Sequence, residues 1–312
     1  MATTQRFVTE RSRGRLSSQV SVTEGKTFSF DKTPIVYRSV GEGNPIICCN
    51  GLGVSTFFWV YLERFFKGSY QIVTWDYRGH GHSGLNKNIK NYSVDALVKD
   101  LKAVVDRLKI KKAIFTGHSL GVQVILEFYR RYPERVRALI PCLGTYGHPM
   151  DTFYNMRLSR YIFQACYWLG IHFPREANLI SRFFLNNPAS FFLGGILKVM
   201  HTGMISHEDC DRYVNHVLAM DPLFFSTLWK SYHEHSTEDV LKKIRVPTLI
   251  IAGEDDQFTP VWISKKMSRL IPRSELLIVK KGTHAALVEQ PELLNLRIEK
   301  FLNERLRLRS RS

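Results

Sequence analysis

The chain has 312 residues, of which 44% are hydrophobic and 23% are charged. This composition excludes a disordered chain and a small disulfide scaffold, and it suits one large α/β domain or a core with one insert. The formal net charge is +16, partly from arginine-rich ends, but the sequence has no zinc-finger spacing, GxxxxGK loop or RNA-recognition motif. We therefore expect no nucleic-acid partner.

The cysteines and the first residues bear on the compartment. The chain has five cysteines, an odd number without a CxxC pair, which favours free thiols in a reducing environment. Residues 1–30 lack the apolar core of a signal peptide, and the apolar stretches are broken before the length of a membrane span. We expect a cytoplasmic protein, and the sequence leaves its oligomeric state open.

Short apolar runs alternate with amphipathic stretches along most of the chain. Runs rich in Ile, Val, Leu or aromatic residues predict strands at 35–40, 45–49, 71–75, 112–116, 136–143, 247–252 and 275–279. Apolar spacings of three and four predict helices at 56–66, 94–108, 120–132, 260–270 and 291–306. This alternation predicts an α/β fold with a mostly parallel sheet of about eight strands and helices on both faces.

The alternation stops at residues 145–235, which predict helices only. This segment holds 17 of the 38 aromatic residues, and its charged side chains cancel. We expect a helical cap over an apolar site, the alternative being that these aromatics pack a small core of the segment's own. The predicted organisation is a basic N-terminal tail, a core in two pieces, the cap and a basic C-terminal tail, at 1–29, 30–144 with 236–305, 145–235 and 306–312.

The strand predicted at 112–116 runs through Gly117-His118-Ser119-Leu120-Gly121 into a helix. A nucleophile at such a tight turn needs small residues two positions before and after it, because neighbouring segments come very close. The turn predicts that Ser119 is a nucleophile and that the Leu120 amide, at the start of the helix, stabilises an oxyanion.

Serine becomes reactive only when a base takes its proton, and two late loops offer the base and a carboxylate. Glu254-Asp255-Asp256 follows the strand predicted at 247–252, and His284 follows the strand predicted at 275–279. Because the carboxyl ends of parallel strands share one edge of a sheet, we expect these groups to meet Ser119 there.

With these motifs in order, the chain resembles the α/β-hydrolase superfamily over about residues 30–305, in its serine esterase or lipase-like branch with a helical cap. The resemblance implies His284 as the base and Asp256 as the acid, with Asp255 as the alternative. It also implies that the Leu52 amide is the second oxyanion donor. Asn50 departs from the family pattern, which often has histidine there, so the hydrogen bonds that support this loop are left open.

The segment Arg78-Gly79-His80-Gly81-His82-Ser83 resembles the family's RGxGxS loop, which implies a mainly structural role, and His80 and His82 are secondary candidates for catalysis. Haloalkane dehalogenases and epoxide hydrolases share this architecture but use an aspartate nucleophile. We therefore expect Ser119 to exclude both.

The predicted function is hydrolysis of carboxylic esters of apolar, medium-to-long-chain substrates through an acyl-enzyme, without metal or cofactor. Carbon–carbon bond hydrolases, lactonases, thioesterases and amidases use the same triad, so they stay open as alternatives. A second alternative is a ligand-binding protein of the same fold with slow turnover. We also consider peripheral contact with an anionic membrane, through the arginine-rich C-terminus and exposed cap aromatics.

Overall fold

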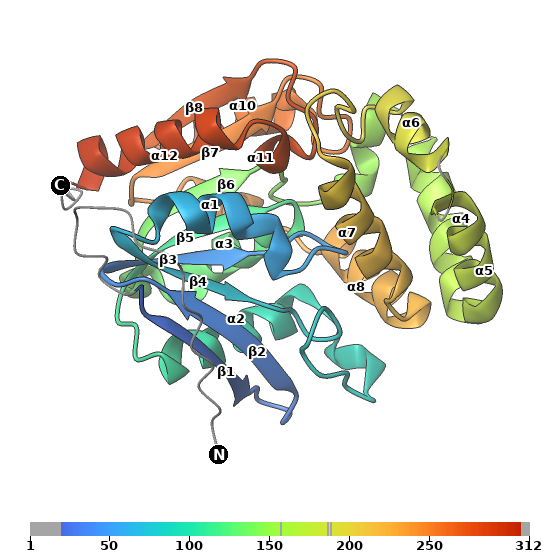
Figure 1. Ribbon diagram of the computed structural model, residues 1–312, viewed down its shortest axis with the longest axis horizontal. Helices are drawn as coiled ribbons and strands as arrows, with labels where there is room; N and C mark the ends of the chain where they lie inside the picture. The colour runs from blue at the N-terminus through green and yellow to red at the C-terminus, as the bar shows by residue number, and fades with distance from the viewer. Residues whose placement is uncertain (1–19, 157, 186, 188, 307–312) are drawn as a thin grey trace, which may run out of the picture.

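The computed structural model describes residues 20–156, 158–185, 187 and 189–306. In this part of the chain one eight-stranded sheet has the order β1-β2-β4-β3-β5-β6-β7-β8. The first two strands pair antiparallel with their neighbours and the others run parallel, as Figure 1 shows. The strands are β1 (Val22–Phe28), β2 (Pro34–Val40), β3 (Asn44–Cys49), β4 (Tyr70–Trp75), β5 (Ala113–His118), β6 (Val136–Cys142), β7 (Thr248–Gly253) and β8 (Ser274–Val279).

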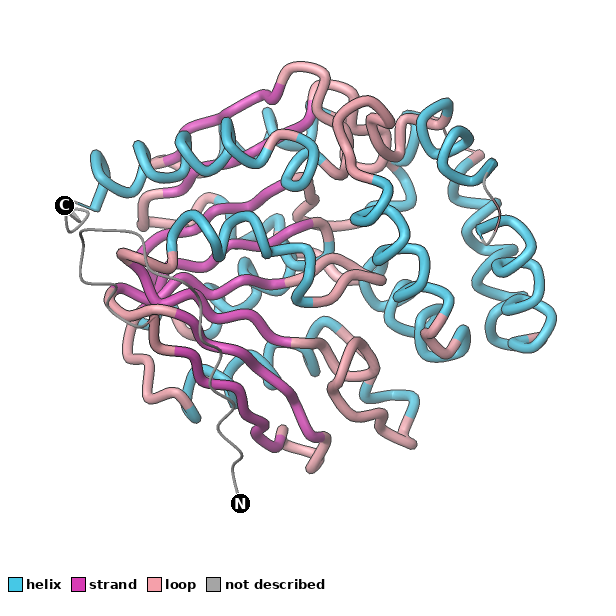
Figure 2. Tube along the Cα trace, viewed as in Figure 1, coloured by secondary structure: helices cyan, strands magenta, loops and turns pink. Residues whose placement is uncertain are grey.

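Helices cover both faces of this sheet because the side chains of its central strands alternate between two apolar cores. In β3, Ile47 and Cys49 face the core under α2 (Val94–Arg107), α3 (Leu120–Arg131) and α10 (Val261–Leu270). Ile46 and Cys48 face the core under α1 (Val60–Phe66), α11 (Ala286–Glu289) and α12 (Pro291–Leu306). The predicted α/β-hydrolase fold, with a mostly parallel sheet between two layers of helices, is confirmed (Figure 2).

The first strand corrects the predicted boundaries. Residues 22–28 were assigned to the N-terminal tail, but they form β1, which pairs with the whole of β2. An edge hairpin strand of this kind lies largely in solvent and has polar residues at most positions, so it lacks the apolar run that marks the buried strands. Residues 1–19 of the predicted N-terminal tail, and residues 307–312 of the predicted C-terminal one, lie outside the described residues.

Between β6 and β7 the described chain is helical and has no strand. An isolated antiparallel bridge between Gly147 and Ser236 ties the two ends of this segment together. Its helices lie beyond the carboxyl edge of the parallel strands, and α4 and α5 form the outer layer (Figure 1). The α-helices of this segment are α4 (Ser159–His172), α5 (Pro174–Leu185), α6 (Ala189–Ile196), α7 (His207–Leu218) and α8 (Pro222–Glu234), and the short α9 (Glu238–Leu241) follows.

A buried arginine fixes the loop that follows β4. Arg78 is fully buried and donates to both carboxylate oxygens of Asp100, at 2.7 and 2.6 Å. It also donates to Asp31 at 2.8 Å and to the Asn91 carbonyl at 2.9 Å. A planar guanidinium can hold these acceptors at once, so it joins α2, the β1–β2 hairpin and the loop.

Replacing Arg78 with methionine will therefore destabilise the fold strongly, because Asp100 and Asp31 lose their cation. We expect a loss of about 3–5 kcal/mol in the free energy of unfolding, measured by urea denaturation. The control is Arg38→Met, which removes a half-exposed arginine paired with Glu24 and Glu63. That variant will lose about 1 kcal/mol or less, and equal losses in the two variants would contradict the role given to Arg78.

Candidate active site

Ser119 occupies a strained turn between β5 and α3. Its φ of 52° and ψ of −113° lie outside the regions that non-glycine residues normally adopt. The flanking glycines are required by contact, since a Cβ on Gly117 would lie 2.3 Å from the Gly121 carbonyl oxygen and one on Gly121 would lie 2.2 Å from that of Cys49. The turn therefore has the geometry that the sequence motif predicts, with Ser119 half-buried at the sheet edge.

The loop after β3 lies directly against this turn. A Cβ on Gly51 would lie 2.7 Å from His118 Nδ1 and 3.3 Å from Ser119 Cβ, which places the following residue, Leu52, beside the serine. The Leu120 N–H is the first of helix α3 and so has no partner within that helix. The N–H groups of Leu52 and Leu120 are thus the two backbone donors available next to Ser119.

Asn50, where the family often has histidine, has complete hydrogen bonding. It is fully buried, its Nδ2 donates to the Trp75 carbonyl at 2.8 Å, and its Oδ1 accepts from Trp59 Nε1 at 2.7 Å. These bonds tie the loop to β4 and to the 3₁₀ turn η1 (Thr56–Trp59). The departure from the family pattern therefore leaves the loop supported.

His80 also holds the loop after β3 by a hydrogen bond. Its ring is fully buried, and its Nε2 accepts a hydrogen bond from the Gly53 N–H at 3.2 Å. Burial lowers the pKa of His80 to about 3, so the ring stays neutral and can act as an acceptor. His82, in contrast, is exposed and contributes only its backbone N–H, which donates to Asp76 at 3.0 Å. Of these two secondary candidates, only His80 contacts the loop that carries Leu52.

Asp256 and His284 are hydrogen-bonded to each other. His284 Nδ1 lies 2.9 Å from Asp256 Oδ2, and Asp256 also accepts from the Phe258 and Thr259 amides and the Thr259 hydroxyl. Burial raises the pKa of Asp256, but the His284 ring and these hydrogen bonds outweigh it and hold the pKa below its usual value. The carboxylate is therefore charged and can orient an imidazolium. Asp255, the alternative acid, instead pairs with Lys198 at 2.8 Å.

His118 is a residue whose role the sequence did not reveal. Its Nε2 lies 2.9 Å from the His284 carbonyl oxygen, and the two rings are 4.9 Å apart. Burial lowers the pKa of His118 to about 3, so the neutral ring donates through Nε2. His118 thus links the serine turn to the backbone of the histidine loop, a contact between residues 166 positions apart.

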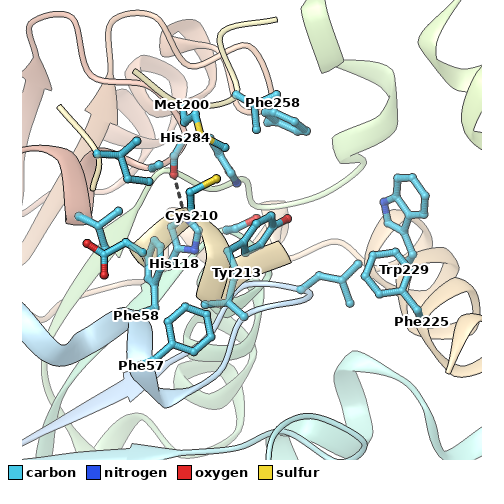
Figure 3. Close-up of a pocket in the computed structure, with 18 of the residues that line it drawn as sticks. Phe57, Phe58, His118, Met200, Cys210, Tyr213, Phe225, Trp229, Phe258 and His284 are labelled. Carbon is cyan, nitrogen blue, oxygen red and sulfur yellow. Dashed lines mark hydrogen bonds between the residues drawn. The ribbon is translucent and has the colours of Figure 1, made fainter. Parts of the chain in front are cut away.

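Ser119 and His284 open onto one apolar cavity of about 260 Å³. The core contributes Leu52, Phe58 and Val288 among others. Figure 3 shows Phe58 and His118 of the core beside Cys210 and Tyr213 of the cap. Ser119 and His284 both line this cavity and make no hydrogen bond to each other. The cap side chains in the lining include Phe163 from α4, Cys210 and Tyr213 from α7, and Phe225, Trp229 and Tyr232 from α8.

Tyr232 brings the one cap hydroxyl that contacts the serine within the described lining. Burial raises the pKa of Tyr232 well above its usual value, and contact with the Ser119 hydroxyl opposes that rise. The two hydroxyls touch without hydrogen-bond geometry, so the buried phenol has no partner. A phenol in this position can donate to an oxygen atom of a bound substrate.

The described residues offer one group with metal-ligand spacing, and it lies away from the cavity lining. His148, Asp151 and His233 place one ligand atom each within 4.8 Å of one another. Two of them are exposed, and Asp151 already pairs with Arg160 at 3.8 Å. Exposed groups of this kind are common without an ion.

Every helix among the described residues is too short or too polar to cross a membrane.

The fold and the placement of Ser119, His284 and Asp256 define an α/β-hydrolase. Residues 46–291 match the family described as serine aminopeptidase, S33, and the chain belongs to this family of hydrolases. It is 26% identical over 283 residues to epoxide hydrolase 4 of Mus musculus, covering 87% of this chain and 77% of that protein. It is 24% identical over 271 residues to the AB hydrolase superfamily protein YisY of Bacillus subtilis, covering 85% and 94%. An esterase from Exiguobacterium antarcticum shares the fold with a TM-score of 0.73 and 18% identity, covering 90% of this chain and all of that one.

The two buried histidines predict a loss of stability in acid. Both have a pKa of about 3 in the folded protein and about 6.5 when unfolded, so between these values the unfolded chain binds protons that the folded chain does not. The free energy of unfolding will therefore fall by up to about 1.4 kcal/mol per pH unit for each histidine as the pH drops below about 6.5.

Urea denaturation of the wild type and His80→Gln from pH 7.5 to pH 4.5 checks this. The slope of the unfolding free energy against pH should be smaller in His80→Gln, because the variant lacks the contribution of one histidine. His82→Gln is the control, since that ring is exposed, and it should keep the wild-type slope. A His80→Gln slope equal to that of the wild type would contradict the assignment.

Proposed function

We propose that the protein is a serine esterase in which Ser119, His284 and Asp256 form a catalytic triad. The observation that carries this proposal is the strained Ser119 turn, which faces a buried His284–Asp256 pair across one cavity. Ser119 attacks the ester carbonyl while His284 takes its proton, and Asp256 stabilises the imidazolium that forms. The Leu52 and Leu120 amides donate to the developing oxyanion. The tetrahedral intermediate then collapses to the acyl-enzyme as His284 gives the proton to the departing alcohol. Water activated by His284 next releases the acid from the acyl-enzyme.

The substrate class follows from the cavity. Its walls are mostly aromatic and aliphatic side chains such as Phe163, Phe225 and Trp229, with Ser119 and His284 among the few polar ones. Such a lining favours an apolar acyl group of medium length over a charged or very small one. The solved esterase of the same fold is consistent with ester chemistry, although at 18% identity it supports the fold alone.

The similarity to epoxide hydrolase 4 brings back a branch that the sequence argument set aside. Epoxide hydrolases of that branch open the epoxide with a carboxylate at the turn, whereas this chain has a serine there. Ser119 occupies this position with the expected geometry, so ester hydrolysis is the better-supported function. An aryl epoxide therefore belongs in the assay beside the esters, and faster turnover of the epoxide would reverse the order of the two functions.

Removing triad members tests the mechanism directly. We expect Ser119→Ala to lower kcat for p-nitrophenyl butyrate by about 10⁶ and Asp256→Asn by about 10⁴. Asp255→Asn is the matched control, because Asp255 pairs with Lys198 rather than His284, and its kcat should stay within about threefold of wild type. A Ser119→Ala protein that keeps most of its esterase activity would refute the proposal.

The cavity predicts how chain length controls turnover. With p-nitrophenyl esters from acetyl to palmitoyl, kcat/KM should rise to a medium-chain optimum and then fall. Cys210→Phe adds volume to the lining and should move the optimum to shorter chains, whereas Trp229→Ala removes volume and should move it to longer ones. Because general destabilisation cannot move the optimum in opposite directions, shifts of the same sign would exclude this cavity as the acyl site.

A further inference from the structure

The outer helices of the cap expose large apolar side chains to solvent. On α4, Tyr161 is 66% exposed and Trp168 54%, and on α5, Phe183 is 75% exposed and Phe184 56%. We call this surface the outer cap face, which in full comprises Tyr161, Ile162, Trp168, Leu179, Ile180, Phe183, Phe184, Phe192 and Ile196. Isolated exposed apolar residues are ordinary, but this many on adjacent helices mark an interaction site.

Helix α5 exposes the large apolar residues that a surface helix normally buries. Leu179, Ile180, Phe183 and Phe184 recur at the spacing of one helix face, and each of them is exposed. The side that is partly buried carries smaller or polar residues such as Ala177 and Asn178. A surface helix normally buries its apolar stripe and exposes its polar one. No residue of α5 is buried, so its apolar stripe is exposed along with its charged residues and is available to something other than the core.

Helix α4 separates this face from the cavity. Its inner side carries Phe163, which lines the cavity and packs edge-on against Trp229 at 4.4 Å. Its outer side carries Tyr161, Ile162 and Trp168. The apolar site and the exposed apolar face are therefore the two sides of one helix.

The chemistry of the face fits a phospholipid bilayer. Trp168 and Tyr161 have apolar bodies and polar tips, the combination that settles at the boundary between acyl chains and headgroups. Arg175 and Arg182 are exposed on α5, and no carboxylate of the described residues lies within ion-pair distance of either guanidinium. They lie two helical turns apart at one border of the apolar stripe, where long cationic side chains can reach lipid phosphates.

We propose that the outer cap face docks on a phospholipid bilayer and that the cavity behind α4 takes its apolar substrate from that bilayer. The docking stands on the exposed surface alone, and the delivery of substrate rests on the proposed esterase function. β1 and the C-terminal end of α12, the described elements next to the arginine-rich chain ends, lie at the other end of the molecule from α4–α6 (Figure 1). The proposed surface keeps the cap aromatics of the sequence-based expectation, whereas most of the C-terminal arginines in that expectation lie outside the described residues.

The test is flotation of the full chain with vesicles of phosphatidylcholine, alone or mixed with phosphatidylserine. Wild type should float with both, and more strongly with the anionic mixture. Leu179→Glu/Phe183→Glu should bind at least about 100-fold more weakly, since each apolar side chain buried in lipid strengthens partitioning by at least about tenfold. The matched control is Leu293→Glu/Leu296→Glu, which changes two half-exposed leucines on α12 and should bind like wild type.

Two further readouts make the result decisive. Trp168 fluorescence should shift to shorter wavelength on vesicle binding, and the shift should be absent in Trp168→Phe. All charge variants should keep wild-type turnover of a water-soluble short-chain ester, which separates failure to dock from failure of the esterase assignment.

Three outcomes would overturn the proposal. The first is absence of flotation with either vesicle. The second is binding that needs phosphatidylserine and survives Leu179→Glu/Phe183→Glu, because the contact would then lie elsewhere. The third is a dimer that this double variant dissociates, because a second copy of the chain would then cover the face.

Discussion

The close approach of three backbone segments around Ser119 is the constraint on which the rest of this structure depends. Glycines at 51, 117 and 121 let the loop after β3, the end of β5 and the start of α3 come within contact distance. This crowding holds Ser119 in a conformation with positive φ, and the packed sheet on either side supplies the free energy that such strain costs. The same approach brings the loop that carries Leu52 against the serine turn, so the strain at Ser119 and the position of this loop have one structural cause.

Several buried polar side chains tie the loops around the serine to distant segments by hydrogen bonds. Asn50 satisfies both ends of its amide, and Arg78 satisfies two carboxylates and a carbonyl. Two neutral histidines do related work. His80 accepts from the loop that carries Leu52, and His118 donates to the backbone of His284. Burial keeps both rings uncharged, so they can join loops without bringing a cation next to the Asp256–His284 pair.

The cap follows different physics from the core. The core buries nearly all of its large apolar side chains between the sheet and its helices, whereas the cap divides its own between the cavity and the outer surface. Phe163 and Trp168, five residues apart on α4, face these two environments. The outer helices α4 and α5 have other cap helices on one side only, so the apolar residues on their other side face solvent or another apolar phase.

The sequence by itself determined the α/β alternation, the serine turn and the loops that carry Asp256 and His284, because each depends on local periodicity or on residues close together in the chain. The weakly apolar edge strand β1 was missed for the same reason, since its pairing with β2 rather than its composition makes it a strand. Only the tertiary structure shows that Asp256 rather than Asp255 pairs with His284 and that both ends of the Asn50 amide are hydrogen-bonded. It also shows the contacts of His118 and His80 and the outward-facing apolar stripe of α5. Each of these depends on which distant segments meet, and local spacing does not encode that.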